Sequence, residues 1–311
     1  MTETSTKTDF TKLNGPTFTW EIWYACNYRC TYCPWEMTKS WEKMSKMHSG
    51  IQPSDWLAAW DRMHAKYGSS HLYLIGGEPI LYPKIDEILE VLARKHYLSV
   101  ITNLSLSLDA ARRLSRELPP DRVRFGASFH PEFSNLDEFV EKLVIFKDAG
   151  FQVWISIVAW PPFVDKLQFY KETFERRGIY PDVHTFFGDY EGKSYPAAYT
   201  AEQKAAISPH LNEVLITHGL EQESTLGKPC VSGYLSAKVL GNGDVYRCGS
   251  LVNYDTPAPM GNILKPDFEL WAAPTPCPRP TCNCGDSRLL LENYVKEHPL
   301  AAALRSSPPA P

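Results

Sequence analysis

The feature that most constrains the fold is a regular alternation of short apolar runs with amphipathic segments between residues 17 and 187. Segments with apolar residues at helical spacing separate strand-like runs. Such alternation predicts a parallel sheet with right-handed helical crossovers, in which ligands bind at the carboxyl ends of the strands. The predicted strands are 17–25, 71–75, 98–101, 122–127, 151–158 and 182–187, and the predicted helices are 53–67, 85–95, 108–118, 136–149 and 164–177.

Three cysteines follow the first strand within eight residues: Cys26, Cys30 and Cys33. Thiolates at such spacings suit an iron–sulfur cluster. Three of them leave one iron of a cubane cluster open to an outside ligand. A structural zinc site needs four closing ligands, and the nearest histidine, His48, is fifteen residues beyond Cys33. Disulfides would need an oxidising compartment, and the chain shows no secretory signal. The sequence therefore favours a cluster.

The spacing C-x3-C-x2-C, with Tyr32 before the last cysteine, resembles the signature of radical S-adenosylmethionine (SAM) enzymes. The resemblance implies that Cys26, Cys30 and Cys33 hold a [4Fe–4S] cluster whose fourth iron is chelated by the amino and carboxylate groups of SAM. It also implies that an electron from the cluster cleaves SAM to a 5′-deoxyadenosyl radical, which abstracts a hydrogen atom from the substrate. Tyr32 is then expected to lie against the adenine.

Further motifs stand at the ends of the next strands. Gly76 and Gly77 follow the second strand, where glycine lets the backbone approach a ligand closely. The resemblance implies that this Gly-Gly-Glu-Pro element holds the amino group of SAM, with Glu78 accepting a hydrogen bond from it. The complete set of expected cofactor-binding residues is Tyr32, Gly76, Gly77, Glu78, Pro79, Asn103, Ser105, Ser128 and Val158.

His130 follows the fourth strand in Ser128-Phe-His130-Pro-Glu132. A histidine with an ordinary pKa near neutrality can act as an acid, a base or a hydrogen-bonding group for a substrate. The alternative is a hydrogen bond that anchors the loop. The strand-end position makes His130 a candidate catalytic residue.

A second cysteine group lies near the C-terminus. Cys230 and Cys248 flank Gly241-Asn242-Gly243-Asp244, a strong hairpin signal that brings the two thiols close. Cys277, Cys282 and Cys284 follow. The pattern C-x12-G-x4-C with late cysteines resembles the auxiliary-cluster domains called SPASM, or the shorter Twitch form. The resemblance implies one auxiliary [4Fe–4S] cluster with all five of these cysteines as candidate ligands, one of them to spare; a zinc hairpin is the alternative.

The spare thiol leaves two reaction outcomes open, and the sequence slightly favours the first of them, epimerisation. Cys277 or Cys284, if it faces the barrel mouth, could return a hydrogen atom to the substrate radical and make the enzyme an epimerase. The auxiliary cluster could instead accept the radical's electron, which gives a dehydrogenase. A packed structural cysteine is the simpler alternative. A non-catalytic iron–sulfur electron carrier is a third possibility, but it needs neither the strand-end motifs nor the barrel.

The predicted architecture is α/β: a partial (β/α)6 barrel of the TIM type with a small auxiliary-cluster domain. We expect a disordered N-terminus at 1–14, the barrel at 15–190, a linker and helix at 191–224, the auxiliary domain at 225–295 and a tail at 296–311. Only 25 residues precede Cys26, too few for a leader-peptide-binding domain. That favours a small molecule such as a sugar, aminoglycoside or nucleoside, or a peptide that binds without a leader domain.

The charge balance and the apolar content of the chain argue against nucleic acid and membranes as binding partners. The chain carries 32 basic and 36 acidic residues, a balance that gives no general drive toward nucleic acid. The longest apolar stretch, 151–163, is too short and too interrupted to span a bilayer. We therefore expect a cytoplasmic protein that binds neither nucleic acid nor a membrane. The resemblance to radical SAM enzymes implies a reductant such as flavodoxin or ferredoxin.

Overall fold

The structure, a computed structural model, describes residues 15–46, 50–249, 258–282 and 288–297. Six parallel strands pair in chain order, each with the next. They are β1 (Thr17–Trp23), β2 (His71–Gly76), β3 (Tyr97–Thr102), β4 (Val123–Ser128), β5 (Gln152–Ala159) and β6 (Pro181–Thr185). This is the partial barrel that the alternation predicts.

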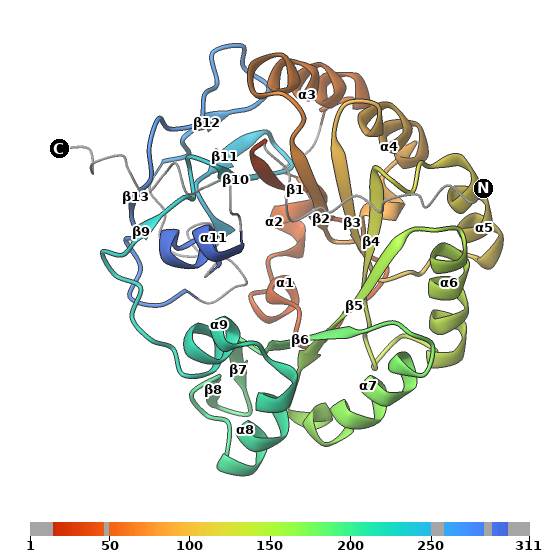
Figure 1. Cartoon of the computed structure of the whole chain (residues 1–311), viewed down its shortest axis with the longest axis vertical. Coiled ribbons are helices and arrows are strands. Elements are labelled where there is room, and N and C mark those ends of the chain that lie inside the picture. Colours follow the sequence, from red (N-terminus) through yellow and green to blue (C-terminus); the bar gives the residue numbers. More distant parts are fainter. Residues whose placement is uncertain (1–14, 47–49, 250–257, 283–287, 298–311) are drawn as a thin grey trace, which may run out of the picture.

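Five helices cover the outside of this sheet as an arc (Figure 1). They are α3 (Pro53–Tyr67), α4 (Ile85–Ala93), α5 (Leu108–Glu117), α6 (Leu136–Asp148) and α7 (Leu167–Glu175). Local capping explains where several begin. Gln52 and Asp55 form a capping box at α3, and the side chains of Ser107 and Asn135 cap α5 and α6.

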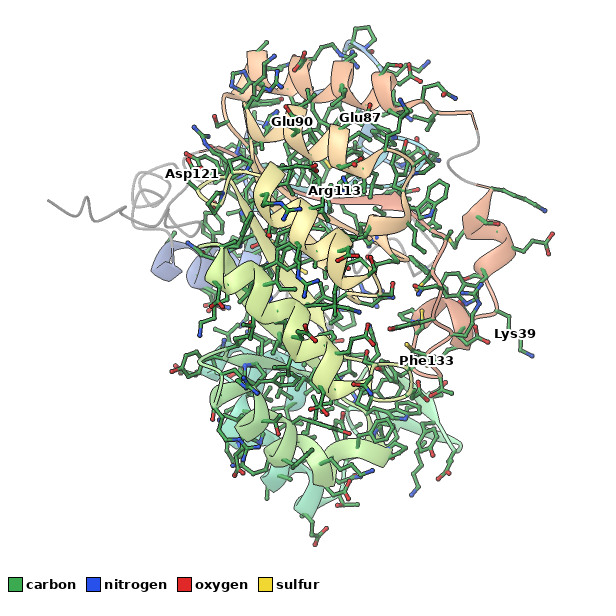
Figure 2. All side chains as sticks on the ribbon, turned by 90° about the vertical axis from the view of Figure 1, so that its right-hand side faces the viewer. Lys39, Glu87, Glu90, Arg113, Asp121 and Phe133 are labelled. Atoms are coloured by element: carbon green, nitrogen blue, oxygen red, sulfur yellow. The ribbon has the colours of Figure 1, made fainter. Side chains whose placement is uncertain are left out.

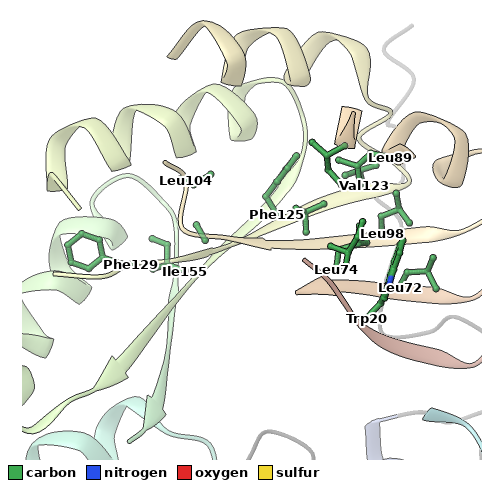
Figure 3. Packing of buried hydrophobic residues seen from close by; sticks show 14 of the residues in the cluster. Trp20, Leu72, Leu74, Leu89, Leu98, Leu104, Val123, Phe125, Phe129 and Ile155 are labelled. Atoms are coloured by element: carbon green, nitrogen blue, oxygen red, sulfur yellow. The ribbon is translucent and has the colours of Figure 1, made fainter. Parts of the chain in front are cut away.

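The main hydrophobic core fills the layer between sheet and helices. Trp20 on β1 is fully buried against Trp56 and Trp60 of α3, with ring centroids 4.9 and 5.2 Å apart. Figure 3 shows side chains from β2, β3 and β4 pointing into the same layer. The opposite face of the sheet is more accessible, since β5 ends in an alternation of buried and partly exposed residues and Thr17, Thr19 and Trp23 of β1 are partly exposed, although Glu21 is buried.

The C-terminal segment continues the barrel sheet. β10 (Ser236–Val239) pairs in parallel with β1, and β11 (Asp244–Tyr246) and β12 (Gly261–Asn262) extend the sheet in antiparallel fashion. The hairpin predicted from Gly241 to Asp244 is confirmed as the β10–β11 turn. The sheet thus runs from the barrel into the predicted auxiliary domain without a break, and the boundary between them stays a prediction.

The remaining elements close the side of the barrel away from the helices. β9 (Pro229–Cys230), β13 (Thr275–Pro276) and α11 (Leu291–Glu297) lie across it (Figure 1). Smaller helices are α1 (Pro34–Met37), α2 (Trp41–Ser45), α8 (Ala201–Ile207) and α9 (Glu213–Leu215), with single turns η1 (Pro79–Leu81), η2 (Pro161–Lys166), η3 (Ser208–His210) and η4 (Ile216–Leu220). No helix within the described ranges is long and apolar enough to cross a membrane.

The expected boundary between the barrel and the linker, after residue 190, falls within a hairpin. β7 (Gly188–Tyr190) and β8 (Lys193–Tyr195) pair in antiparallel fashion. Their two turn residues, Glu191 and Gly192, have positive φ angles of 49° and 73°. Two positive φ angles define the turn type that suits a two-residue hairpin. The sequence analysis overlooked this turn signal.

Candidate functional site

The three N-terminal cysteines lie on the loop between β1 and α1, at the carboxyl end of the sheet. Figure 2 places Lys39 and Phe133 at this end of the molecule and Asp121, which precedes β4, at the other. The Cys33 amide donates to the Cys30 carbonyl at 2.9 Å, and the Cys33 carbonyl accepts from the first turn of α1. The loop is therefore ordered by its own backbone and by the start of a helix.

All three thiols are at least partly buried and none is bridged. Burial raises the pKa of each thiol, and that of Cys30 reaches about 12, with the Glu132 carboxylate as the next contribution. Thiolates in such surroundings need a positively charged partner. The Tyr28 amide donates to Cys26 Sγ at 3.4 Å, a contact that supports charge on the sulfur. Three unbridged thiols on one ordered loop fit the ligand set of an iron–sulfur cluster.

The two glycines after β2 lie directly against the strand that leads into the cysteine loop. A Cβ on Gly76 would meet the Trp23 carbonyl oxygen at 1.9 Å, and one on Gly77 would meet the Ala25 oxygen at 2.4 Å. The Gly77 amide donates to Trp23 at 2.6 Å, and the Glu78 amide donates to Ala25 at 2.9 Å. In this structure, glycine is required by backbone packing beneath the cysteine loop, a reason that the sequence analysis did not foresee.

Glu78 is 1% exposed and its carboxylate already accepts three hydrogen bonds. Thr102 Oγ1 and the Ile80 amide donate to Oε1 at 2.6 and 3.1 Å, and the Asn103 amide donates to Oε2 at 2.6 Å. A carboxylate has about four acceptor positions, so Oε2 keeps one for a ligand. Burial raises the pKa of Glu78 to about 7, although these three hydrogen bonds act in the opposite direction.

The polar segment after β3 contacts the cysteine loop. Asn103 Nδ2 donates to Asn27 Oδ1 at 3.1 Å and lies 3.8 Å from Cys26 Sγ. Ser105 Oγ donates to the same Asn27 oxygen at 3.2 Å. Leu104 between them has φ +52°, and its carbonyl accepts from the buried Lys142 ammonium. The structure therefore brings Glu78, Asn103 and Ser105 together around the first cysteine.

Tyr32 and His130 form a second contact to the cysteine loop. Tyr32 Oη lies 2.8 Å from His130 Nδ1, the two rings stack, and Trp160 packs near Tyr32. Burial lowers the pKa of His130 to about 4, so its ring is neutral at neutral pH. The ordinary pKa assumed for His130 in the sequence analysis is therefore wrong. A neutral ring that accepts from Tyr32 has a proton on Nε2 to donate to a ligand.

The last two expected cofactor residues lie on neighbouring strands. Ser128 ends β4 and pairs with Ser156, and Val158 lies two residues further along β5. Both are partly accessible. Pro79 is buried and begins η1. Every expected residue of the N-terminal site thus lies at the carboxyl end of the sheet.

Three residues that hold the site together were missed from the sequence. Asn27 joins the cysteine loop to Asn103 and Ser105, and Thr102 donates to Glu78. Glu132 accepts from the Thr31 amide at 3.0 Å and from the Thr31 hydroxyl at 2.6 Å. Each of the three lies in or directly beside an expected ligand or strand-end motif, and a polar residue at such a position could have been predicted to support the site.

The C-terminal cysteines gather around one pocket. Cys230, Cys248, Cys277 and Cys282 line it together with Arg247 and Arg279, around about 340 Å³ of space that is partly open to solvent. Within the described ranges, no three His, Cys, Asp or Glu side chains stand close enough to share one metal ion. Sulfurs around a single zinc ion lie about 3.8 Å apart, given Zn–S bonds near 2.3 Å. A cluster is larger than an ion and reaches thiolates that stand further apart, so this donor set fits an iron–sulfur cluster.

Cys277, a candidate hydrogen donor, lies with the other candidate cluster ligands and not apart from them. Cys277 lines the four-cysteine pocket, with Sγ 3.7 Å from Thr225 Oγ1. Cys284, the other candidate donor and fifth candidate ligand, lies outside the described residues. Four thiols around one pocket supply a complete ligand set for one cubane cluster without Cys284.

Comparison with known proteins agrees with this geometry. Residues 20–168, just under half of the chain, match the family described as the radical SAM superfamily. An S-adenosylmethionine-dependent nucleotide dehydratase from Thermoplasmatales archaeon (strain ISO4-H5) is 33% identical over 87 residues. That match spans 27% of this chain and 28% of the dehydratase.

Solved structures share the fold over a longer stretch. SuiB from Streptococcus suis has a TM-score of 0.54 at 16% identity, over 81% of this chain and 64% of SuiB. The anSMEcpe structure with bound AdoMet and Cp18Cys peptide has a TM-score of 0.56 at 17% identity, over 81% of this chain and 78% of that protein. Coverage of 81% reaches beyond residues 20–168, so the likeness includes part of the C-terminal segment.

Proposed function

We propose that this chain is a radical SAM enzyme with one auxiliary cluster, because residues 20–168 match the radical SAM superfamily, whose members use a [4Fe–4S] cluster and SAM. Bound together, the first cluster and SAM supply a one-electron cleavage that yields methionine and a 5′-deoxyadenosyl radical, which abstracts a hydrogen atom from the substrate. Cys26, Cys30 and Cys33 are the proposed ligands of that cluster. The observation that carries the proposal is the convergence of Glu78, Asn103 and Ser105 on the cysteine loop.

Different residues of the chain are proposed to bind different groups of SAM. Glu78 keeps one acceptor position on Oε2 for the ammonium group, while its other contacts fix the Asn103 backbone. Asn103 and Ser105 are proposed to bind the methionyl carboxylate and the ribose. Tyr32, Ser128 and the β5 backbone at Val158 are proposed to contact the adenosine. His130 holds Tyr32 in place and, as a neutral ring, can donate from Nε2 to a bound ligand.

For the reaction outcome we favour dehydrogenation of the substrate. The supporting observation is the four-cysteine pocket, because four thiolates would saturate an auxiliary cluster and leave it suited to accepting an electron. The balance would then be complete: one electron enters from a flavodoxin or ferredoxin, the 5′-deoxyadenosyl radical takes one hydrogen atom from the substrate, and the substrate radical would lose its further electron to the auxiliary cluster and a proton to solvent. Epimerisation is the second candidate, and it requires Cys284 to return a hydrogen atom.

The substrate is proposed to be a small molecule, with a peptide as the alternative. The dehydratase is named for a nucleotide, whereas SuiB is solved with its precursor peptide SuiA and anSMEcpe with the Cp18Cys peptide. The partly accessible inner face of the barrel, with its charged side chains, supports a compact polar substrate.

Anaerobic reconstitution tests this function. The wild type should bind about eight irons per chain, and reduction with dithionite in the presence of SAM should release 5′-deoxyadenosine. The triple variant Cys26→Ala/Cys30→Ala/Cys33→Ala should lose about half of the iron and all of the 5′-deoxyadenosine. The quadruple variant of Cys230, Cys248, Cys277 and Cys282 should also lose about half of the iron but keep the cleavage. A triple variant that still cleaves SAM would contradict the assignment.

Product analysis in D₂O separates the two outcomes. Dehydrogenation gives a product two mass units lighter than the substrate, whereas epimerisation gives a product with one deuterium and a mass one unit higher. Under the favoured outcome Cys284→Ala leaves product formation intact. If Cys284→Ala abolishes product but keeps both clusters and 5′-deoxyadenosine formation, the epimerase takes its place.

A further inference from the structure

We propose that Glu21 and Lys238 form a substrate-recognition pair inside the barrel, in which Glu21 Oε2 accepts a hydrogen bond from a hydroxyl or ammonium group of the substrate. This proposal rests on the proposed function, since it places the substrate next to the SAM site. It names the chemistry of one end of the substrate: a hydrogen-bond donor, charged or neutral.

Glu21 lies on the inner face of the sheet. Trp20, its neighbour on β1, packs outward against Trp56 and Trp60. Successive side chains of a strand point to opposite faces, so Glu21 points away from the helices. Lys238 of β10 pairs with Thr19, which shares the face of Glu21. The two charged side chains therefore meet on the concave side of the barrel, one from each end of the chain.

The pair is buried but incompletely hydrogen-bonded. Lys238 Nζ lies 2.5 Å from Glu21 Oε1, and the side chains are 13% and 7% exposed, respectively. Within the part of the chain that the structure describes, Glu21 Oε2 is buried and has no hydrogen-bond partner, although the Tyr24 hydroxyl interacts with the Glu21 side chain. A buried oxygen of a charged group that is left unpaired is costly and rare in proteins. A structural ion pair between β10 and β1 would gain from satisfying both oxygens, so the free one indicates a missing donor.

The position suits contact with a substrate beside SAM. Glu21 pairs with Ile75, and the next pair along β1 and β2 is Trp23 with Gly76. The partner of Glu21, Ile75, is two residues before Gly77. Glu21 therefore lies about 7 Å below the level of Gly77 along the strand direction. Between Glu21 and Trp23 the register shifts by a bulge, a feature that occurs often beside active sites because it re-aims side chains.

The Arg124 guanidinium, which lies on the same face, is already engaged. Arg124 Nε donates to Ser99 Oγ and its Nη2 donates to Tyr73 Oη, both at 2.7 Å, while Trp154 packs 4.8 Å from its guanidinium. Neighbouring strands pair in one row across the sheet at Thr19 of β1, Tyr73 of β2, Ser99 of β3 and Arg124 of β4. With Arg124 held in this way, Glu21 Oε2 is an acceptor that lacks a donor among the described residues, and the substrate is expected to supply one.

The experiment uses reconstituted, anaerobic enzyme with SAM and two probes, glucosamine and glucose. Both carry hydroxyl groups, but glucosamine alone carries an ammonium. Binding is measured by saturation-transfer NMR titration of the wild type, Glu21→Gln and Glu90→Gln. Glu90 is the matched control because its side chain is 57% exposed on α4, far from the inner face (Figure 2). Glutamine keeps the size of Glu21, and iron content with the thermal unfolding midpoint shows whether each variant is folded.

We expect Glu21→Gln to weaken probe binding at least tenfold, the size of one lost charge-assisted hydrogen bond, and Glu90→Gln to leave it unchanged. If the enzyme binds glucosamine but not glucose, the site recognises an ammonium group. If it binds both sugars, the site recognises a hydroxyl group. The proposal is overturned if neither sugar binds the wild type or if Glu21→Gln binds as tightly as the wild type. Release of 5′-deoxyadenosine without a probe tests the proposed function independently, so its presence beside unchanged probe binding would reject this inference alone.

Discussion

Replacement of Glu78 by alanine tests whether this residue binds SAM alone or also supports the site. The change leaves the Asn103 and Ile80 amides without the acceptors that the carboxylate gives them at 2.6 and 3.1 Å. Each unpaired buried amide costs about 1–3 kcal/mol, so the free energy of unfolding should fall by about 2–6 kcal/mol. The lost contact to the ammonium group should weaken SAM binding at least tenfold as well.

Urea unfolding under anaerobic conditions measures the first effect, and equilibrium dialysis with labelled SAM measures the second. Glu87→Ala is the matched control, since Glu87 is 67% exposed on α4 (Figure 2). A loss of stability below about 1 kcal/mol would refute the supporting role, because it is less than one unpaired amide costs. Unchanged SAM affinity would refute the binding role.

The pKa of Glu78 adds a pH signature to the same variant series. Its folded value of about 7 lies above the ordinary 4.5 because of burial. Between these values the folded chain holds a proton that the unfolded chain has released, so stability falls as pH rises from 4.5 through 7. The fall is at most about 3 kcal/mol, at 1.36 kcal/mol per pKa unit. Glu78→Gln should remove this slope, and an identical slope in the variant would show that another group causes it.

Three further predictions concern two residues around the site and one, His96, that precedes β3 at the opposite end of the sheet. Gly77→Ala should prevent normal cluster loading, measured as iron per chain, because its Cβ would overlap the Ala25 carbonyl oxygen; normal loading would contradict the packing. Lys142→Met should weaken SAM binding severalfold in dialysis by leaving the Leu104 carbonyl unpaired beside Asn103, whereas the exposed Lys147→Met should not. Burial lowers the pKa of His96 to about 4, so stability should fall between pH 6.5 and 4 by up to about 3 kcal/mol, and His96→Gln should flatten that fall.

The fold was predictable because its signals are local. The limits of α3 follow from Gln52, Pro53 and Gly68, and the structure reproduces the predicted 53–67. Each predicted barrel strand corresponds to a strand of the structure within two residues at either end. The pairing of β10 with β1 was not predictable in the same way, since it joins segments more than two hundred residues apart. Nothing in the local pattern of Ser236–Val239 specifies its neighbour.

The sequence proposes the residues of the candidate site but not their partners. Spacing and resemblance indicate the cysteines, Glu78, Asn103 and His130, and the structure places these residues at the carboxyl ends of the strands. Their hydrogen bonds depend on side-chain packing between distant loops, as with Glu132 and Thr31. For the same reason the sequence assumed an ordinary pKa for His130, which burial lowers. Glu21 was missed because a single acidic residue in an aromatic strand carries no signal until Lys238 is placed beside it.

The most direct test of the central claim is electron–nuclear double resonance on the reduced enzyme with SAM labelled by ¹⁵N in its amino group and ¹⁷O in its carboxylate. Three cysteine ligands leave one iron open, so both labels should show hyperfine coupling to the cluster in the wild type. The quadruple variant of Cys230, Cys248, Cys277 and Cys282 should retain both couplings, and the triple variant of Cys26, Cys30 and Cys33 should lose them. Absence of both couplings in a wild type that carries its full iron would contradict an open iron at Cys26, Cys30 and Cys33.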